Sequence, residues 1–112
     1  MISCDAVRAM ALSLPEAEEC DHLGRPSFRV RDKVFATLWE LEARAVLKLS
    51  PDAQDALVAS DPRTFLVGPG SNQGWTGVEL ATIDLDLFRD LLVGSWRQIA
   101  PRRIVAAYDD RH

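Results

Sequence analysis

A chain of 112 residues suffices for one domain, and we expect residues 1–112 to form a single one. Apolar residues make up 47% and charged residues 27%, which is typical of a globular protein and argues against a disordered chain. No apolar run approaches the roughly 20 residues of a membrane span and no signal-peptide pattern is visible, so we expect a cytoplasmic protein without a membrane partner. The net charge of −4 disfavours non-specific nucleic-acid binding by the whole surface.

The first third of the chain predicts a helix followed by an edge strand. Residues 3–14 have apolar side chains at helical spacing, and Ser3 is a favourable cap. Pro15 ends the helix, because proline disfavours a helical conformation in the residue before it. Residues 16–23 are acidic and predict a first strand at the edge of a sheet, followed by a turn over 24–26.

Residues 27–39 predict a hairpin. If Asp32 and Lys33 form a two-residue turn, apolar and basic side chains alternate between the two faces of the hairpin. In that register one face holds four residues that we expect in the core: Phe28, Val30, Phe35 and Thr37. Arg29 and Arg31 then point the other way. Asp-Lys is not a favoured turn pair, which leaves the register open by one residue.

The remaining elements complete a two-layer pattern. They are a strand over 44–49, a helix from Ser50 to about 59, strands over 64–67 and 75–80, an amphipathic helix over 84–99 and a short helix from Pro101 to about 108. The elements do not alternate regularly between strand and helix. The order predicts an α+β fold: an antiparallel β-sheet covered on one face by the N- and C-terminal helices.

Motifs for catalysis or cofactors are absent from the sequence. The loop GPGSNQG, residues 68–74, precedes a strand and lacks the Gly-Lys-Ser/Thr that a phosphate-binding loop needs. His22 with Ser27 or Cys20 is the one conceivable nucleophile pair, and no nucleophile motif surrounds it. Cys4 and Cys20 lack zinc spacing, and we expect buried or half-buried free thiols. We therefore expect no enzymatic activity, no catalytic residue and no cofactor.

A basic segment makes the clearest candidate site. Residues 25–48 carry six basic and three acidic side chains in an otherwise acidic chain. The candidate nucleic-acid-binding residues are Arg25, Arg29, Arg31, Lys33, Lys48 and Trp75. If Arg29, Arg31 and Lys48 share the sheet face opposite the helices, they form a basic surface that suits phosphates. The alternative is a solvated sheet face whose arginines pair across strands with Glu40 or Glu42.

The tryptophans and the acidic segment offer two further readings. Trp39, Trp75 and Trp96 could stack bases. Trp75 follows a glycine-rich loop and is the best candidate for an exposed ring, whereas Trp96 lies on the apolar stripe of the long helix and belongs to the core. The acidic residues that could hold a metal ion weakly are Glu16, Glu18, Glu19 and Asp21. The alternative for them is a solvated edge that resists sheet-to-sheet aggregation.

The chain resembles the MmcQ/YjbR family along nearly its whole length. The segments that carry the resemblance are LSLPEAEE, GRPSFRVRDKVFATL, AVLKLSPD, GWTGVEL, LLVGSW and APRRIVAAYDD. Trp96 stands where the family more often carries Tyr. The resemblance implies a frataxin-type (CyaY-like) α+β sandwich and a DNA-binding role through hairpins of the sheet, with no catalytic residue to transfer. Frataxins bind iron through an acidic ridge on the first helix and first strand, whereas the first helix here has only Asp5 on its acidic side.

Our hypothesis from the sequence is a small, non-enzymatic, monomeric protein that binds DNA through the basic hairpin and sheet face. The alternative is a protein-interaction module without a nucleic-acid role. Weak metal binding at the acidic first strand ranks third.

Overall fold

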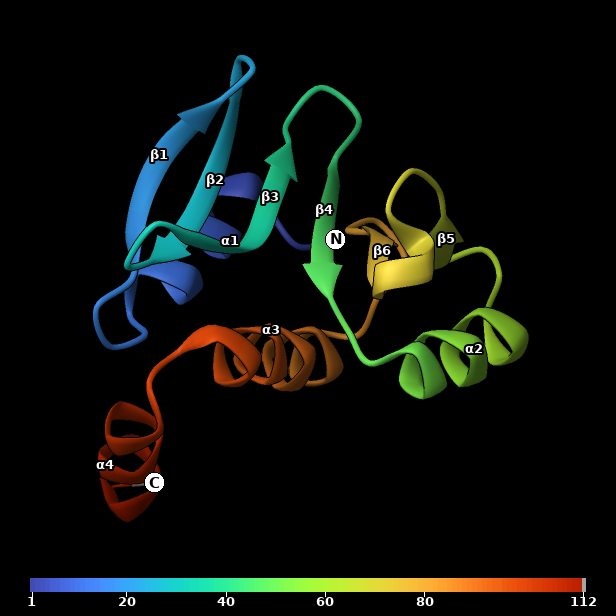
Figure 1. Ribbon diagram of the computed structural model, residues 1–112. Coiled ribbons are helices and arrows are strands. Elements are labelled where there is room, and N and C mark those ends of the chain that lie inside the picture. The colour runs from blue at the N-terminus through green and yellow to red at the C-terminus, as the bar shows by residue number, and fades with distance from the viewer. Residues whose placement is uncertain (112) are drawn as a thin grey trace.

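The computed structural model describes residues 1–111, and it contains a six-stranded antiparallel sheet with four α-helices (Figure 1). The elements in chain order are α1 (Cys4–Leu12), β1 (Glu18–His22), β2 (Arg25–Val30), β3 (Lys33–Trp39), β4 (Arg44–Lys48), α2 (Pro51–Ser60), β5 (Phe65–Val67), the 3-10 turn η1 (Ser71–Gln73), β6 (Trp75–Glu79), α3 (Leu85–Ile99) and α4 (Arg102–Arg111). The strand order is β1-β2-β3-β4-β6-β5, which confirms β1 as an edge strand.

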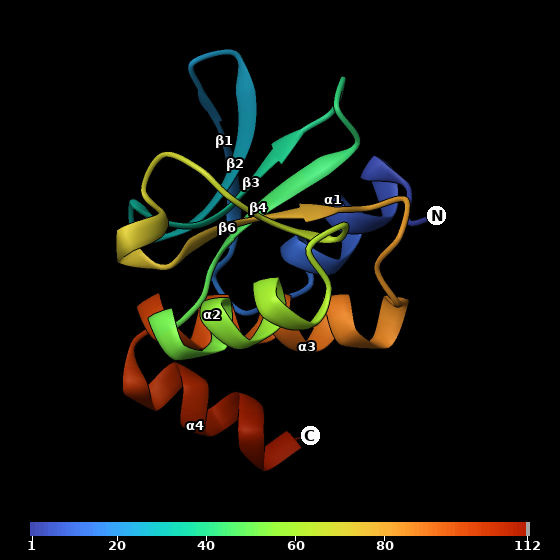
Figure 2. The same ribbon diagram turned by 90° about the vertical axis from the view of Figure 1, so that its right-hand side faces the viewer.

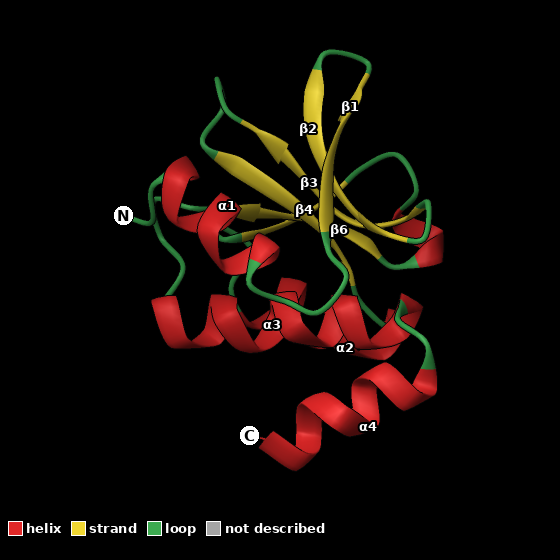
Figure 3. Ribbon diagram, turned by 90° about the vertical axis from the view of Figure 1, so that its left-hand side faces the viewer, coloured by secondary structure: helices red, strands yellow, loops and turns green. Residues whose placement is uncertain are grey.

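The helices α1 and α3 lie against one face of the sheet, so the predicted α+β architecture is confirmed. Figure 2 shows α4 beyond α3, on the side away from the sheet. Figure 3 shows that loops and the short η1 lie on the opposite side of the strands. We call this opposite side the open face. No helix within residues 1–111 is long and apolar enough to cross a lipid bilayer.

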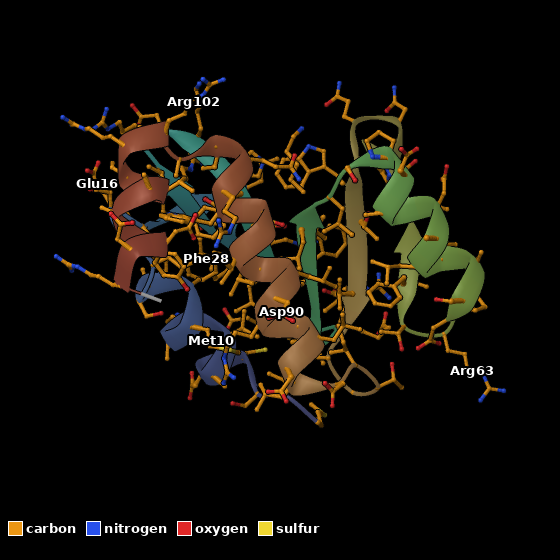
Figure 4. The ribbon with its side chains drawn as sticks, turned by 90° about the horizontal axis from the view of Figure 1, so that it is seen from below. Met10, Glu16, Phe28, Arg63, Asp90 and Arg102 are labelled. Carbon is orange, nitrogen blue, oxygen red and sulfur yellow. The ribbon has the colours of Figure 1, made fainter. Side chains whose placement is uncertain are left out.

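The core fills the space between the sheet and the helices. Phe28 from β2 is fully buried and lies behind the helices in Figure 4. On α3 the predicted apolar stripe supplies Phe88, Leu92 and Trp96 to the core, whereas Leu85 in the first turn is 44% exposed. The Trp96 indole N–H donates to the Pro15 carbonyl at 3.1 Å, which satisfies its buried polar atom and joins α3 to the segment after α1.

The predicted helix starts are confirmed, because each rests on a local interaction. The hydroxyls of Ser3 and Ser50 accept from backbone amides three residues on, and the Asp84 carboxylate does the same for α3. The first predicted turn lies one residue earlier than expected, at Leu23 and Gly24, which both have positive φ. Arg25 therefore opens β2 instead of lying in the turn.

The predicted register of the β2–β3 hairpin is wrong. The turn residues are Arg31 and Asp32, with φ of 51° and 69°, as the twist of a tight two-residue hairpin requires. A bulge between the two strands then lets both Phe35 and Ala36 reach the core. Beyond the bulge, side chains alternate in the opposite sense to the prediction. Thr37 therefore lies on the open face and not in the core.

Candidate functional site

The open face is hollowed between two tryptophans. Its floor consists of Thr37, Val46 and Gly77, which lie side by side across β3, β4 and β6. Two adjoining hollows of about 430 and 120 Å³ lie over this floor, and both border Trp39 and Trp75. We call the two hollows together the tryptophan groove.

Each tryptophan of the groove lies under a cation. The Arg25 guanidinium carbon is 4.0 Å from the centre of the Trp39 ring, and the Lys48 ammonium is 5.2 Å from the centre of the Trp75 ring. Both distances are within the range of cation–π attraction. Lys48 also donates to the Gln73 carbonyl at 3.3 Å. Within residues 1–111 neither cation forms an ion pair with a carboxylate, so both positive charges stay available to an anion.

A buried polar network holds Trp75 in place. The side-chain amide of Gln54, on α2, donates to the Trp75 carbonyl at 3.2 Å and to the Thr76 hydroxyl at 2.9 Å. The Thr76 hydroxyl in turn donates to the Gly74 carbonyl at 3.0 Å. Because Gln54 and Thr76 are buried, losing either partner would leave polar atoms unsatisfied. The network fixes the backbone from which the Trp75 ring projects.

Gly74 allows the loop to approach β4. Its φ is +94°, and a Cβ there would lie 1.8 Å from the Leu49 carbonyl oxygen. The close approach lets the Leu49 amide donate to the Gly74 carbonyl at 2.9 Å. Only glycine fits both the conformation and the space.

Two side chains of α3 hold the backbone of Lys48 in place. The hydroxyl of the buried Ser95 donates to the Lys48 carbonyl at 2.8 Å, and the Gln98 amide donates to the same oxygen at 3.0 Å. These two residues of α3 satisfy the Lys48 carbonyl at the end of β4. Neither residue was predicted to have this role, because each lies about half the chain away from Lys48 in sequence.

The structure brings three of the six predicted site residues to the groove: Arg25, Lys48 and Trp75. Arg29 lies on the same face of β2, but its Nε donates to the Ser27 hydroxyl at 3.1 Å, beside the neighbouring strand β1. Lys33 pairs with the buried Val30 at the hairpin end, and its side chain is exposed there.

The expected grouping of Arg29, Arg31 and Lys48 on one face is wrong for Arg31. This residue lies in the hairpin turn, and its Nε donates to the Glu16 carboxylate at 3.1 Å. The alternative, in which these arginines pair with Glu40 or Glu42, is also wrong for Arg29 and Arg31, because they donate to Ser27 and Glu16. The cross-strand ion pair on this face joins Arg44 of β4 to Glu79 of β6, at 2.7 Å.

Trp39 was not among the predicted site residues. In the predicted register Trp39 follows Phe35 and Thr37 on the face that packs against the core, whereas the observed register places it on the open face. A hairpin turn at Arg31 and Asp32 would have corrected the assignment only together with the bulge, and nothing in the sequence marks that bulge. The Gln54 network was missed as well, because a glutamine on a short helix has no distinctive pattern.

The acidic segment is engaged by arginines. Glu19 accepts from Arg8 Nε at 2.9 Å, and the hydrogen bond to this carboxylate raises the pKa of the Arg8 guanidinium. The same guanidinium lies 3.2 Å from Asp5 and 3.7 Å from Glu40. In the part of the chain that the structure describes, no three acidic, histidine or cysteine side chains come together as metal ligands. The geometry gives the metal hypothesis no support.

The conceivable nucleophile has a structural role. Ser27 is fully buried, its hydroxyl donates to the Cys20 carbonyl at 3.0 Å, and it accepts from Arg29. Cys4 and Cys20 are half-buried free thiols, as predicted. Burial, followed by the nearby Glu40 carboxylate, raises the pKa of the Cys4 thiol, which makes it a weak nucleophile.

Comparison with known proteins agrees with the resemblance in sequence. The family model YjbR matches residues 12–98. The crystal structure of the Deinococcus radiodurans protein DR2400, which carries a DUF419 domain, matches with a TM-score of 0.77 and 24% identity, over 86% of this chain and 77% of that one. At this identity the likeness establishes the fold alone. No curated protein matches the chain. With a family model that covers most of its length, the chain belongs to the YjbR family.

Proposed function

We propose that the chain is a non-enzymatic module that binds nucleic acid through its open face. The observation that carries this proposal is the pairing of Trp39 with Arg25 and of Trp75 with Lys48 around one groove. Cations attract phosphates, and exposed aromatic rings give bases a surface on which to stack. A guanidinium that lies over a ring still directs N–H donors outward, toward a phosphate.

The distribution of charge supports this proposal. The chain has a net charge of −4, yet no carboxylate lines either hollow of the groove among the described residues. Glu79 lies on the open face of β6, and Arg44 neutralises its charge. A local positive field in an acidic protein favours an anionic partner at this face alone.

A protein partner is the second candidate, because two large apolar side chains at the groove are exposed. Leu23 borders the larger hollow and is 86% exposed, and Val67 borders the smaller one and is 61% exposed. Exposed apolar side chains beside a concavity are a common feature of protein-binding surfaces. This candidate predicts no affinity for DNA at moderate salt.

The test is a salt titration of DNA binding with charge-reversed variants. The purified protein is mixed with fluorescent DNA of mixed sequence, as single strand and as duplex. We expect affinity to fall as salt rises, with a log–log slope of roughly one for each phosphate contacted. Arg25→Glu/Lys48→Glu should abolish binding.

The matched control is Arg102→Glu/Arg103→Glu, which makes the same change in net charge on α4. Both residues are exposed, and Arg102 projects outward from the start of that helix (Figure 4). This variant should bind within about threefold of the parent. Absence of binding by the parent at low salt, or an equal loss in the control, would overturn the proposal.

A further inference from the structure

We infer that the nucleic acid is single-stranded, and that unpaired bases enter the tryptophan groove and stack against Trp39 and Trp75. This inference rests on the proposed function and specifies its substrate. It follows from what the open face presents: rings and a hollow, rather than a projecting basic element.

The rings favour unpaired bases. In a duplex the bases stack on one another and expose only their edges in the grooves, so an aromatic ring has no base face to meet. Trp39 and Trp75 are half-buried, and each has one side against its own cation while bordering both hollows. Rings held in this way are rigid platforms, which is the arrangement that stacks single-stranded bases.

The hollow has a suitable size for a base. Its larger part, of about 430 Å³, lies within the roughly 300–1,000 Å³ that is usual for small-ligand pockets. The lining combines the apolar surface of Val46 and Pro69 with the hydroxyl of Thr37. An apolar floor with few polar groups accepts any base face without demanding one sequence.

The β2–β3 hairpin is poorly suited to bind a DNA duplex in its major groove. A hairpin that enters the major groove must project, with free basic side chains at its tip. Here the β2–β3 turn has two residues, and Arg31 in that turn is engaged by Glu16, which leaves Lys33 as a single exposed basic side chain at the tip. On the open face, by contrast, Arg25 and Lys48 lie together beside the hollow, and neither forms an ion pair among the described residues.

The spacing of the two platforms sets a minimum length for the strand. Trp39 aligns with Arg44 in the register, and Trp75 aligns with Lys48, four residues farther along β4. Four residues of a strand span roughly 13 Å, and β3 and β6 lie roughly 10 Å apart on either side of β4, so the two backbone positions are roughly 16 Å apart. A stacked nucleic-acid strand advances about 3.4 Å per nucleotide, so about five nucleotides reach from one platform to the other.

The experiment compares fluorescent oligothymidylates of two, four and ten nucleotides with a 20-base-pair duplex at one low salt concentration. We expect the ten-nucleotide strand to bind at least tenfold more tightly than the duplex, and the two-nucleotide strand to bind weakly. Trp39→Ala and Trp75→Ala should each weaken single-strand binding by about tenfold or more. Trp75→Phe, which keeps a ring, should retain most of the affinity.

A second variant keeps the test valid if the alanine variants fold poorly. Gly77→Val fills the smaller hollow without removing a ring or a charge, since a Cβ there meets Arg44 and Leu66 at an ordinary 3.4 Å. Valine suits a strand, so the fold should persist. We expect several-fold weaker single-strand binding, with an unchanged melting temperature as the check on folding.

The possible results separate this inference from the proposed function. If the duplex binds as tightly as the single strand, and the Trp and Gly77 variants change nothing while Arg25→Glu/Lys48→Glu abolishes binding, the single-strand inference is wrong and the proposed function holds. If neither form of DNA binds at low salt, both proposals fail.

Discussion

Two groups of basic side chains in this protein have different partners. On the helix side, Arg8, Arg31 and Arg97 donate to carboxylates, the last to Asp109 at 2.8 Å. On the open face, Arg25 and Lys48 lie over tryptophan rings. The first group is neutralised within the fold, whereas the second keeps its charge for an outside partner. A count of basic residues in the sequence cannot distinguish the two.

The difference has a physical basis in donor geometry. A carboxylate occupies guanidinium N–H groups directly, because both charge and hydrogen bonds are satisfied in the plane of the group. A ring contacts only the face of the guanidinium and leaves its in-plane donors free. Arg25 can therefore hold Trp39 in place and still bind a phosphate, whereas Arg8 has its donors occupied.

The largest expected effect is on stability, and it compares a glycine of the loop beside the groove with a glycine of the helix α3. Gly74→Ala forces a Cβ against the Leu49 carbonyl oxygen at a positive φ, so we expect a loss of about 3 kcal/mol or more in the free energy of unfolding. The matched control is Gly94→Ala in α3, where nothing lies within 4 Å of the added Cβ. That change should stabilise the protein by up to about 1 kcal/mol through helix propensity. Urea unfolding measures both, and equal effects would contradict the role assigned to Gly74.

A smaller effect separates a structural arginine from a binding one. Arg8→Ala removes the partner of three carboxylates and leaves them to repel one another, so we expect a loss of about 1 kcal/mol in the free energy of unfolding that shrinks at high salt. DNA binding should not change.

Arg25→Met keeps an aliphatic chain over Trp39, so stability should stay within about 0.5 kcal/mol while DNA binding weakens. Urea unfolding and the DNA titration test the pair, and a loss of binding in Arg8→Ala would break the distinction.

The smallest effect concerns the thiol on the helix side. The pKa of Cys4 is raised, so the folded state holds its proton more firmly than the unfolded chain, and stability from this group is lost as pH rises above the ordinary thiol value of about 8.5. In a Cys20→Ser background, alkylation of Cys4 at pH 8 should be several-fold slower in the folded protein than in urea.

Arg8→Ala provides the check on this electrostatic cause. Arg8 lowers the pKa of Cys4, in opposition to burial and the Glu40 carboxylate. Its removal should therefore slow alkylation further. A faster reaction in this variant would show that access to the thiol, rather than its charge state, controls the rate.

Local interactions allowed much of the fold to be predicted from the sequence. The caps at Ser3, Ser50 and Asp84 each act within three residues, and the stripe of α3 depends only on the helical repeat. The alternation along β4 likewise separates the buried Ala45 and Leu47 from Val46 and Lys48 on the open face. Three of the site residues, Arg25, Lys48 and Trp75, followed from composition and local pattern.

The tertiary structure alone decided which side chains share the open face. One bulge in the β2–β3 hairpin turned Trp39 outward, and a bulge depends on packing of Phe35 and Ala36 against helices far along the chain. The partners of the arginines were equally non-local, since Arg44 meets Glu79 and Arg31 meets Glu16 across long stretches of sequence. Local pattern thus determined the elements and the residues available, whereas contacts between distant segments determined which positive charges remain free.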